Sequence, residues 1–282
     1  MYNVRMSIAK GFLQKCSQLI SKDSEVIDMT IPSLNPLAEM IPNHKVRMNL
    51  RPYRYTIIDD FFTDEYYQKL CSEYERFLAL GLAEEDDQYR FSRFSSYDAY
   101  GFTPNPREES AISIFRTQAW RQYFSDLFSI DFTDDEVMAL HHHLPSSKDG
   151  WVHNDYSLCS FSDDYLQNGI NPWYHQCTYE DSDPFKQPNT RKVMRSVTLI
   201  YYLNNDCDGK YGGETGLFSD EHTLAEKVAP KNNRLMAFEV SPHSFHAFQA
   251  NTKYPRSTIT QWFHADPQET FKRFNNSNFI PW

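Results

Sequence analysis

The chain has 282 residues, a formal net charge of −10, 40% hydrophobic residues and 16% aromatic residues. This length suits one large domain, and the apolar content excludes a disordered chain, because it suffices to form a substantial core. The acidic balance, without a basic stripe, argues against a nucleic-acid partner.

Five widely spaced cysteines without a CxxC pair disfavour a disulfide framework and a cysteine-rich zinc site, and favour a reducing compartment. The N-terminal stretch lacks the uninterrupted apolar segment and the cleavage site of a signal peptide. No apolar run is long enough to span a bilayer. We therefore predict a cytoplasmic protein without a membrane contact.

The N-terminal part is expected to contain a helix and a connector. Apolar residues recur at helical spacing over 5–21, which predicts an amphipathic helix packed on the main domain. Four prolines between residues 30 and 53 predict an irregular connector. We therefore assign residues 1–52 to an N-terminal helical extension with its connector, and residues 53–282 to the main domain.

The main domain begins with helices and continues with strands. A strand is predicted over 55–62, a helix over 63–79 and a second helix over 109–128. From about residue 135, short β-branched and aromatic runs alternate with turn residues, at 136–144, 150–153, 195–204, 215–219, 233–240, 245–250 and 256–264. This order predicts an α+β chain whose catalytic half is a sandwich or barrel.

His153 and Asp155 stand two residues apart in a short predicted strand. In a strand, both side chains point to one face and can converge on one point. A neutral imidazole and a carboxylate are two of the three ligands in the facial triad that binds non-haem iron(II). The alternative is a surface turn, because an HxD triplet alone is weakly specific.

The segment 241–246 offers two histidines, His243 and His246, as a third ligand. Arg256 follows His246 at a distance that fits one strand, a turn and the start of the next strand. Such a hairpin would hold the histidine at the metal and the guanidinium deeper in the pocket. Arg256 and Thr258 are again two apart, so together they can clamp a carboxylate.

Further motifs occur in a fixed order between and after these residues. They are a YYLN run at 201–204, a GGE turn at 212–214, a PxxxRLxxF strand at 230–238 and a final strand with Trp262, which is expected in the core. With the HxD triplet and the histidine, they make the chain resemble the prolyl-4-hydroxylase-like branch of the iron(II)- and 2-oxoglutarate-dependent oxygenases. The resemblance implies a double-stranded β-helix (jelly-roll) core with N-terminal helices packed on it.

The resemblance also implies cofactors and a reaction. Iron(II) binds the cosubstrate 2-oxoglutarate, O2 is consumed with release of succinate and CO2, and an unactivated C–H bond is hydroxylated, with ascorbate as a reductant. In halogenating relatives a small residue replaces the acidic ligand. Because Asp155 keeps its carboxylate, hydroxylation is favoured here.

Residue by residue, the resemblance implies that His153, Asp155 and His246 are the metal ligands and that Arg256 pairs with the distal carboxylate of 2-oxoglutarate. His246 is preferred over His243, because relatives place this ligand about a dozen residues after the arginine of the RLxxF strand.

Other pocket residues follow from the same comparison and from strand parity. Tyr202 matches a phenol that helps to bind the distal carboxylate. Thr198 shares the strand face of Tyr202, and Thr258 shares that of Arg256. Arg195 matches an arginine near the substrate. His143 can face the pocket together with His141, with ordinary strand histidines as the alternative.

The HxD triplet and the YYLN run are much farther apart than in compact relatives. Residues 156–194 are therefore predicted to form a substrate lid, with Trp173, Tyr174 and Arg191 as substrate contacts. The long insert and the lack of an appended peptide-binding domain favour a small molecule, such as an amino acid or a specialised metabolite. The alternatives are hydroxylation of a peptidyl residue such as proline, and a non-catalytic cupin-like binding protein. The sequence leaves the oligomeric state open.

Overall fold

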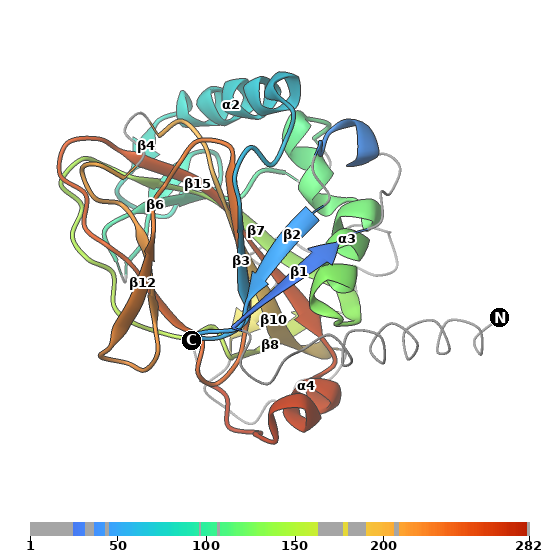
Figure 1. Cartoon of the computed structure of the whole chain (residues 1–282). Coiled ribbons are helices and arrows are strands. Elements are labelled where there is room, and N and C mark those ends of the chain that lie inside the picture. Colours follow the sequence, from blue (N-terminus) through green and yellow to red (C-terminus); the bar gives the residue numbers. More distant parts are fainter. Residues whose placement is uncertain are drawn as a thin grey trace.

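The computed structural model describes residues 25–31, 37–42, 45–95, 97–105, 108–162, 177–179, 190–205 and 209–280. Within them, two β-sheets face each other, and helices α2 (Asp64–Leu78) and α3 (Gln118–Phe128) cover the outer face of the larger sheet (Figure 1). Helix α4 (Pro267–Phe274) follows the last strand. Two short 3-10 helices, η1 (Leu37–Glu39) and η2 (Ala111–Arg116), lie in connections.

The larger sheet is mixed but mainly antiparallel, and each of its strands pairs with the next in space. The spatial order is β1 (Val26–Thr30), β2 (Lys45–Asn49), β3 (Tyr55–Ile58), β13 (Arg234–Glu239), β10 (Thr190–Tyr202), β15 (Arg256–Ala265), β7 (Phe132–His143), β6 (Tyr100–Phe102), β5 (Phe91–Arg93) and β4 (Leu82–Ala83). Strand β8 (Leu158–Ser162) branches from β10, and β9 (Cys177–Tyr179) pairs with β8. The smaller sheet has the order β12 (Leu224–Val228), β11 (Thr215–Phe218) and β14 (Phe245–Phe248).

The chain alternates between the two sheets. From β7 it passes to His153, which forms a single bridge with His246 of β14, and it then returns to the large sheet in β8 and reaches β10. It continues through β11 and β12 in the small sheet, β13 in the large one, β14 in the small one and β15 in the large one. This path of antiparallel strands is a jelly roll, or double-stranded β-helix. The predicted α+β fold with that core is confirmed.

Strand parity divides the buried side chains of the large sheet into two sets. On β10, Leu199 and Tyr201 belong to one apolar core with Tyr74 of α2 and Trp120 of α3. The alternate residues of the same strand face the small sheet, and a cavity remains between the two sheets. The helices therefore stabilise one face of the sheet and leave the other face free for a site.

The predicted helices differ in how well they match. Helix α2 lies within the predicted range 63–79, and the Thr63 hydroxyl caps it by accepting a hydrogen bond from the backbone N–H of Tyr66. The helix predicted over 109–128 is interrupted, because Thr117 has an extended backbone and caps α3 with its hydroxyl. Its first part is the 3-10 helix η2.

The prediction of an irregular connector over 30–53 is wrong at residues 45–49. These form β2, which pairs with β1 and with β3, and its burial alternates so that Val46 and Met48 enter the core. The helix predicted over 5–21 lies outside the described residues. The domain boundary at residue 52 stays a prediction.

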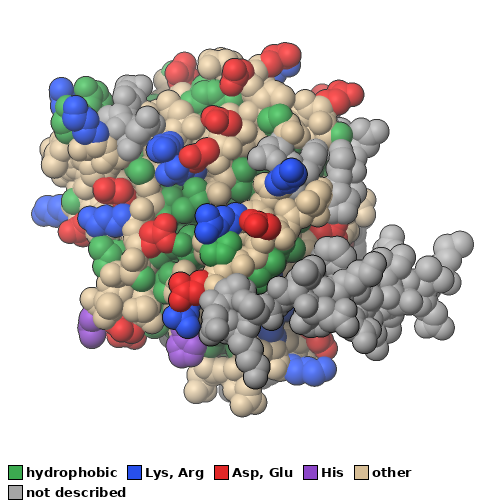
Figure 2. Space-filling model, viewed as in Figure 1, with side chains coloured by type: hydrophobic (Ala, Val, Ile, Leu, Met, Phe, Trp, Pro, Cys, Tyr) green, Lys and Arg blue, Asp and Glu red, His purple; other side chains and the backbone are tan. Residues whose placement is uncertain are grey.

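The surface carries charges of both signs. On the face seen in Figure 2, acidic and basic side chains lie interspersed, with hydrophobic side chains visible between them. None of the described helices combines the length and the apolar composition needed to cross a lipid bilayer.

Candidate metal centre and its cavity

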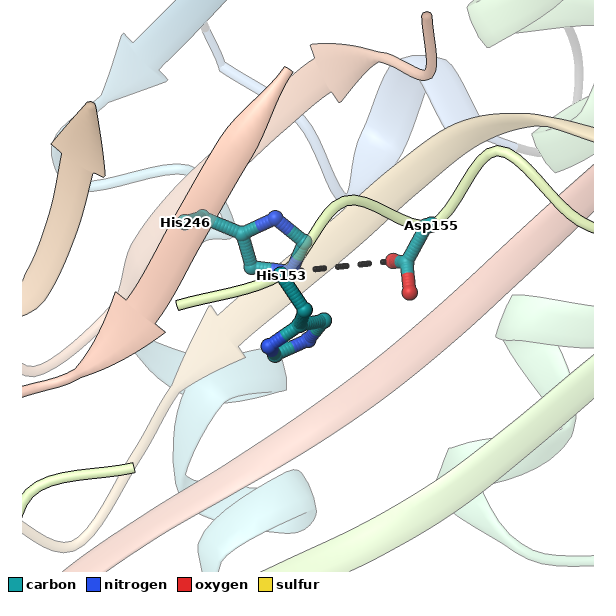
Figure 3. Close-up of side chains that lie close together, drawn as sticks. All are labelled: His153, Asp155 and His246. Carbon is teal, nitrogen blue, oxygen red and sulfur yellow. Dashed lines mark ion pairs between the residues drawn. The ribbon is translucent and has the colours of Figure 1, made fainter. Parts of the chain in front are cut away.

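Three predicted ligands meet at one point between the sheets. The ligand atoms of His153, Asp155 and His246 all lie within 4.8 Å of one another, and Nε2 of His246 is 3.7 Å from Oδ2 of Asp155 (Figure 3). The bridge between His153 and His246 brings the two imidazoles together, with ring centroids 4.4 Å apart.

The local structure around the HxD triplet differs from the prediction. Residues 151–157 form no strand apart from the bridge at His153, so strand parity is not what aligns His153 with Asp155. Nor do His246 and Arg256 lie in one hairpin, because β14 belongs to the small sheet and β15 to the large one. The two residues approach the cavity from opposite sheets.

Both imidazoles are fixed by backbone carbonyls. Nδ1 of His153 lies 2.9 Å from the carbonyl oxygen of Trp151, and Nδ1 of His246 lies 3.2 Å from that of Ser244. A carbonyl only accepts hydrogen bonds, so each Nδ1 must carry the proton. This assigns the tautomer and leaves each Nε2 lone pair available to a metal, as is usual for metal-bound histidines.

The carboxylate of Asp155 accepts three hydrogen bonds from side chains. Its Oδ1 accepts from Nη1 of Arg195 at 2.7 Å, and its Oδ2 accepts from the Thr198 hydroxyl at 2.6 Å and from the Trp262 indole at 2.8 Å. All three donors come from the adjacent strands β10 and β15.

The surroundings keep the ligands in the protonation states that a metal requires. Burial favours a raised pKa for Asp155, but the Arg195 guanidinium, the two imidazoles and the Thr198 hydroxyl hold that pKa well below its usual range. Burial, followed by repulsion from His246, lowers the pKa of His153 to about 4. Burial also lowers the pKa of His246. The set is therefore one carboxylate and two neutral imidazoles at neutral pH.

The three ligands line a cavity of about 900 Å³ between the sheets. At another part of its wall lies Arg256, which is 5% exposed and donates from Nη2 to the Thr215 hydroxyl at 2.9 Å. Its guanidinium also lies 5.2 Å from the ring centre of Tyr202 and 5.3 Å from that of Phe248. No carboxylate of the described residues forms an ion pair with Arg256.

Comparison with known proteins agrees with this geometry. The model of the 2OG-Fe(II) oxygenase superfamily matches residues 172–264, which include His246, Arg256 and the donors to Asp155. Over these residues the chain is similar to this superfamily. The predicted resemblance to the iron(II)- and 2-oxoglutarate-dependent oxygenases is thereby confirmed.

The relatives found are prolyl hydroxylases. The chain is 37% identical over 90 residues to prolyl 3-hydroxylase sudestada1 from Drosophila melanogaster, and this match takes in 27% of the chain and only 17% of that relative. Among solved structures, a Pseudomonas putida prolyl-4-hydroxylase has a TM-score of 0.49 at 16% identity, covering 75% of this chain and 92% of that one. A prolyl hydroxylase in complex with a hypoxia inducible factor peptide fragment from Trichoplax adhaerens has a TM-score of 0.49 at 15% identity, covering 77% and 85%.

The donor set fits the iron(II) of this superfamily. Two imidazole nitrogens and one carboxylate oxygen that face a common point form a facial triad, and such a triad leaves further coordination positions open. The rival histidine, His243, is exposed and stands outside this group. The structure thus brings together the three residues predicted as ligands.

The residues predicted to bind 2-oxoglutarate together with Arg256 differ in whether they reach the cavity. Thr198 lines the cavity but donates to Asp155. Tyr202 and Thr258 are fully buried beside Arg256 and are not part of the cavity wall, and the Tyr202 hydroxyl lies 2.6 Å from that of Thr215. The hydroxyl of Thr258 is buried and has no hydrogen-bond partner within the described part of the chain.

The consecutive histidines of β7 obey strand parity. His141 and His143 line the cavity, whereas His142 points away and its Nδ1 lies 3.1 Å from the Ser257 hydroxyl. His143 stacks on Phe248 with ring centroids 3.7 Å apart, and its Nδ1 is buried without a partner. The pKa of His143 is well below its usual value, chiefly because of burial.

Three features of the cavity were missed by sequence reasoning. Thr215, directly after the GGE turn, reaches Arg256, and Trp262, expected in the core, donates to Asp155. Phe94 and Tyr97 of the β5–β6 turn also line the wall, stacked at 4.9 Å, and the Tyr97 hydroxyl lies 3.1 Å from Nδ1 of His141. Only the position of Thr215 beside a recognisable motif was a usable signal.

The predicted substrate contacts remain mostly open. Trp173 and Tyr174, together with most of the insert 156–194, lie outside the described residues. Arg191 forms an ion pair with the buried Asp135. Arg195 is buried against Asp155, the predicted metal ligand, although it also lines the cavity.

Proposed function

We propose that the chain is an iron(II)- and 2-oxoglutarate-dependent dioxygenase that hydroxylates a peptidyl residue, with proline as the leading candidate. Two parts of this proposal have separate support. The cosubstrate follows from the chemistry of the cavity, and the substrate class follows from the relative in Drosophila melanogaster.

The observation that carries the cosubstrate assignment is the state of Arg256. A buried guanidinium that has no acidic partner among the described residues is costly, so an anion is expected to bind it. The distal carboxylate of 2-oxoglutarate supplies that anion in the same cavity as the metal ligands, and a planar guanidinium can bind it through two hydrogen bonds.

Different residues would bind the metal and the cosubstrate. His153, Asp155 and His246 would hold the iron, which supplies the activation of O2 when it is bound. Arg256 and Thr215 would fix the far end of the cosubstrate, and this fixes the orientation of its near end toward the ligands. A cavity of about 900 Å³ lies at the upper end of the range of about 300–1,000 Å³ for small-molecule sites. It therefore leaves room for part of a second reactant.

The substrate class is proposed from the relative. The match to a prolyl 3-hydroxylase favours a peptidyl residue over the small molecule expected from the length of the insert. The small-molecule prediction has no support from the comparisons. A non-catalytic binding protein is disfavoured because all three ligands and Arg256 are present at the cavity.

The reaction is tested by succinate release. The chain is incubated under air with iron(II), ascorbate and 2-oxoglutarate, and succinate is quantified. We expect slow release without substrate, and none when His246 is replaced by alanine. Absence of release with iron bound would support the non-catalytic alternative.

The substrate class is tested by mass spectrometry. Proline-containing peptides and free amino acids are compared for products heavier by one oxygen atom. We expect oxygen incorporation into a prolyl residue of a peptide. Product from free amino acids alone would restore the small-molecule prediction and leave the dioxygenase assignment intact.

A further inference from the structure

Three neighbouring side chains fix the carboxylate of Asp155 in one orientation. Its carboxylate is 2% exposed and accepts hydrogen bonds from Arg195, Thr198 and Trp262. We propose that Arg195 and Trp262 are positioning residues that orient Asp155, so that one defined oxygen faces the metal. This inference rests on the proposed function, because it assumes that Asp155 is an iron ligand.

The two oxygens of Asp155 have different surroundings. Oδ1 takes the guanidinium of Arg195 at 2.7 Å, which is the stronger, charge-assisted contact. Oδ2 lies 3.7 Å from Nε2 of His246, on the side where the other ligands meet. Thr198 and Trp262 also donate to Oδ2. We assign Oδ2 to the metal from its position beside Nε2 of His246, while the guanidinium of Arg195 holds Oδ1. The carboxylate would bind through a single oxygen.

A β-bulge makes this arrangement possible. In a regular strand Arg195 and Thr198 would point to opposite faces, because they are three residues apart. The pairing of β10 with β15 shifts between Arg195, which pairs with His264, and Val197, which pairs with Phe263. The extra residue turns Arg195 to the face of Thr198, and redirection of a side chain is a known use of bulges beside active sites.

Trp262 holds Asp155 directly and through Arg195. Its indole N–H donates to Oδ2 at 2.8 Å, and the Arg195 guanidinium lies 4.6 Å from its ring centre. Each residue therefore limits the movement of the other. Arg195 is therefore paired with a predicted metal ligand and lies over the indole beside that ligand. This assigns Arg195 a role other than the substrate contact expected from the sequence.

The experiment measures iron(II) affinity by anaerobic calorimetry, without cosubstrate. Trp262→Phe removes the N–H donor without a change of charge, and Arg195→Lys keeps the charge but lacks the planar fork. We expect each variant to raise the Kd for iron(II) about 10-fold, the lower end of the effect of residues that orient metal ligands. Arg51→Lys changes an exposed arginine in the same way and should leave the Kd unchanged.

A third variant separates positioning from simple charge repulsion by the direction in which it changes the Kd for iron(II). Arg195→Met removes a positive charge near the metal, so tighter iron binding by this variant would overturn the proposal. Wild-type affinity in Trp262→Phe would overturn it as well. If Arg195→Lys does not fold, as judged by its thermal unfolding, Trp262→Phe decides alone. If the unaltered chain binds no iron(II), the proposed function fails instead.

Discussion

At the scale of single residues, the two histidines of the segment 241–246 provide a matched pair. His246 is buried and belongs to the ligand group, whereas His243 is exposed and lies outside it. We expect His246→Ala to abolish iron(II) binding and succinate release, because two protein ligands remain. His243→Ala should retain both. Calorimetry with iron(II) checks this, and comparable losses in both variants would contradict the ligand assignment.

The second residue-scale prediction concerns Arg256. Replacement by methionine removes the guanidinium that we expect to bind the distal carboxylate of 2-oxoglutarate beside Thr215. A hydrogen-bonded ion pair of this kind is worth about 2–4 kcal/mol, so the affinity for 2-oxoglutarate should fall roughly 30- to 1,000-fold. Iron(II) affinity should stay close to that of the unaltered chain.

Arg256→Lys serves as the control for charge. It keeps a cation but loses the planar fork, so part of the affinity for 2-oxoglutarate should return. Titration with 2-oxoglutarate in the presence of iron(II) measures both variants. Unchanged affinity in Arg256→Met would remove the basis of the cosubstrate assignment.

Sequence reasoning selected the candidate ligands partly for the wrong reason. Spacing and resemblance selected His153, Asp155 and His246, although no strand aligns the first two. The contact between Arg195 and Asp155 was beyond reach, because a bulge depends on the pairing of two strands and leaves no local pattern. Trp262 was assigned to the core, since an aromatic residue in an apolar strand gives no sign of its partner.

At the scale of elements, the GGE turn before β11 can be tested through its glycines. Gly212 has a φ of +90°, and a Cβ there would lie 2.0 Å from the carbonyl oxygen of Ala250. Gly81 has a similar φ of +99° and no atom within 4 Å of such a Cβ. Both substitutions by alanine carry the backbone penalty of about 1–2 kcal/mol, but only Gly212→Ala adds a collision with backbone.

Gly212→Ala should therefore lower the free energy of unfolding clearly more than Gly81→Ala. It should also weaken 2-oxoglutarate binding, because the turn leads into Thr215 and pairs with Asn251 before Arg256. Urea unfolding measures the first effect and cosubstrate titration the second. Equal destabilisation by the two substitutions would show that the turn can move away from Ala250.

Elements with strong periodicity were the predictable ones. Helix α2 and the strands β7, β10, β13 and β15 lie close to their expected ranges. The short strands β4, β5 and β6 escaped prediction, because two or three residues are too few to display alternation. Helix α4 was also missed, although Asp266 caps it and Pro267 begins it.

At the scale of the whole molecule, buried histidines make stability depend on pH. Burial lowers the pKa of His141 to about 3 and those of His142 and His264 to about 4, and it lowers the pKa of His143 well below its usual value. In the unfolded chain each has a pKa of about 6.5. The folded state thus excludes protons that the unfolded state binds between pH 6.5 and 4.

The free energy of unfolding should therefore be highest above pH 6.5 and fall as the pH is lowered toward 4. Each of these histidines contributes up to about 1.4 kcal/mol per pH unit within that window. Urea unfolding of the metal-free chain at pH 7, 6 and 5 tests this. A stability that is constant over these values would mean that the four imidazoles are accessible to protons in the folded state.

The overall architecture was predictable only through the family resemblance. Composition and periodicity indicated a sandwich or barrel, but the alternation of β7, β10, β11, β13, β14 and β15 between two sheets follows from long-range pairing. The participation of β1 and β2 in the large sheet was hidden by prolines that suggested an irregular connector.

The placement of His246 and Arg256 on opposite sheets has a consequence for the choice of cosubstrate. Facing sheets pack at a spacing of roughly 10 Å, set by the side chains between them. The distance between the metal site and the guanidinium of Arg256 is therefore set by the layer of side chains between the sheets. An oxo-diacid shorter or longer than 2-oxoglutarate by one methylene group should fit poorly. Competition by oxaloacetate and 2-oxoadipate for cosubstrate binding would measure which diacid lengths the cavity accepts.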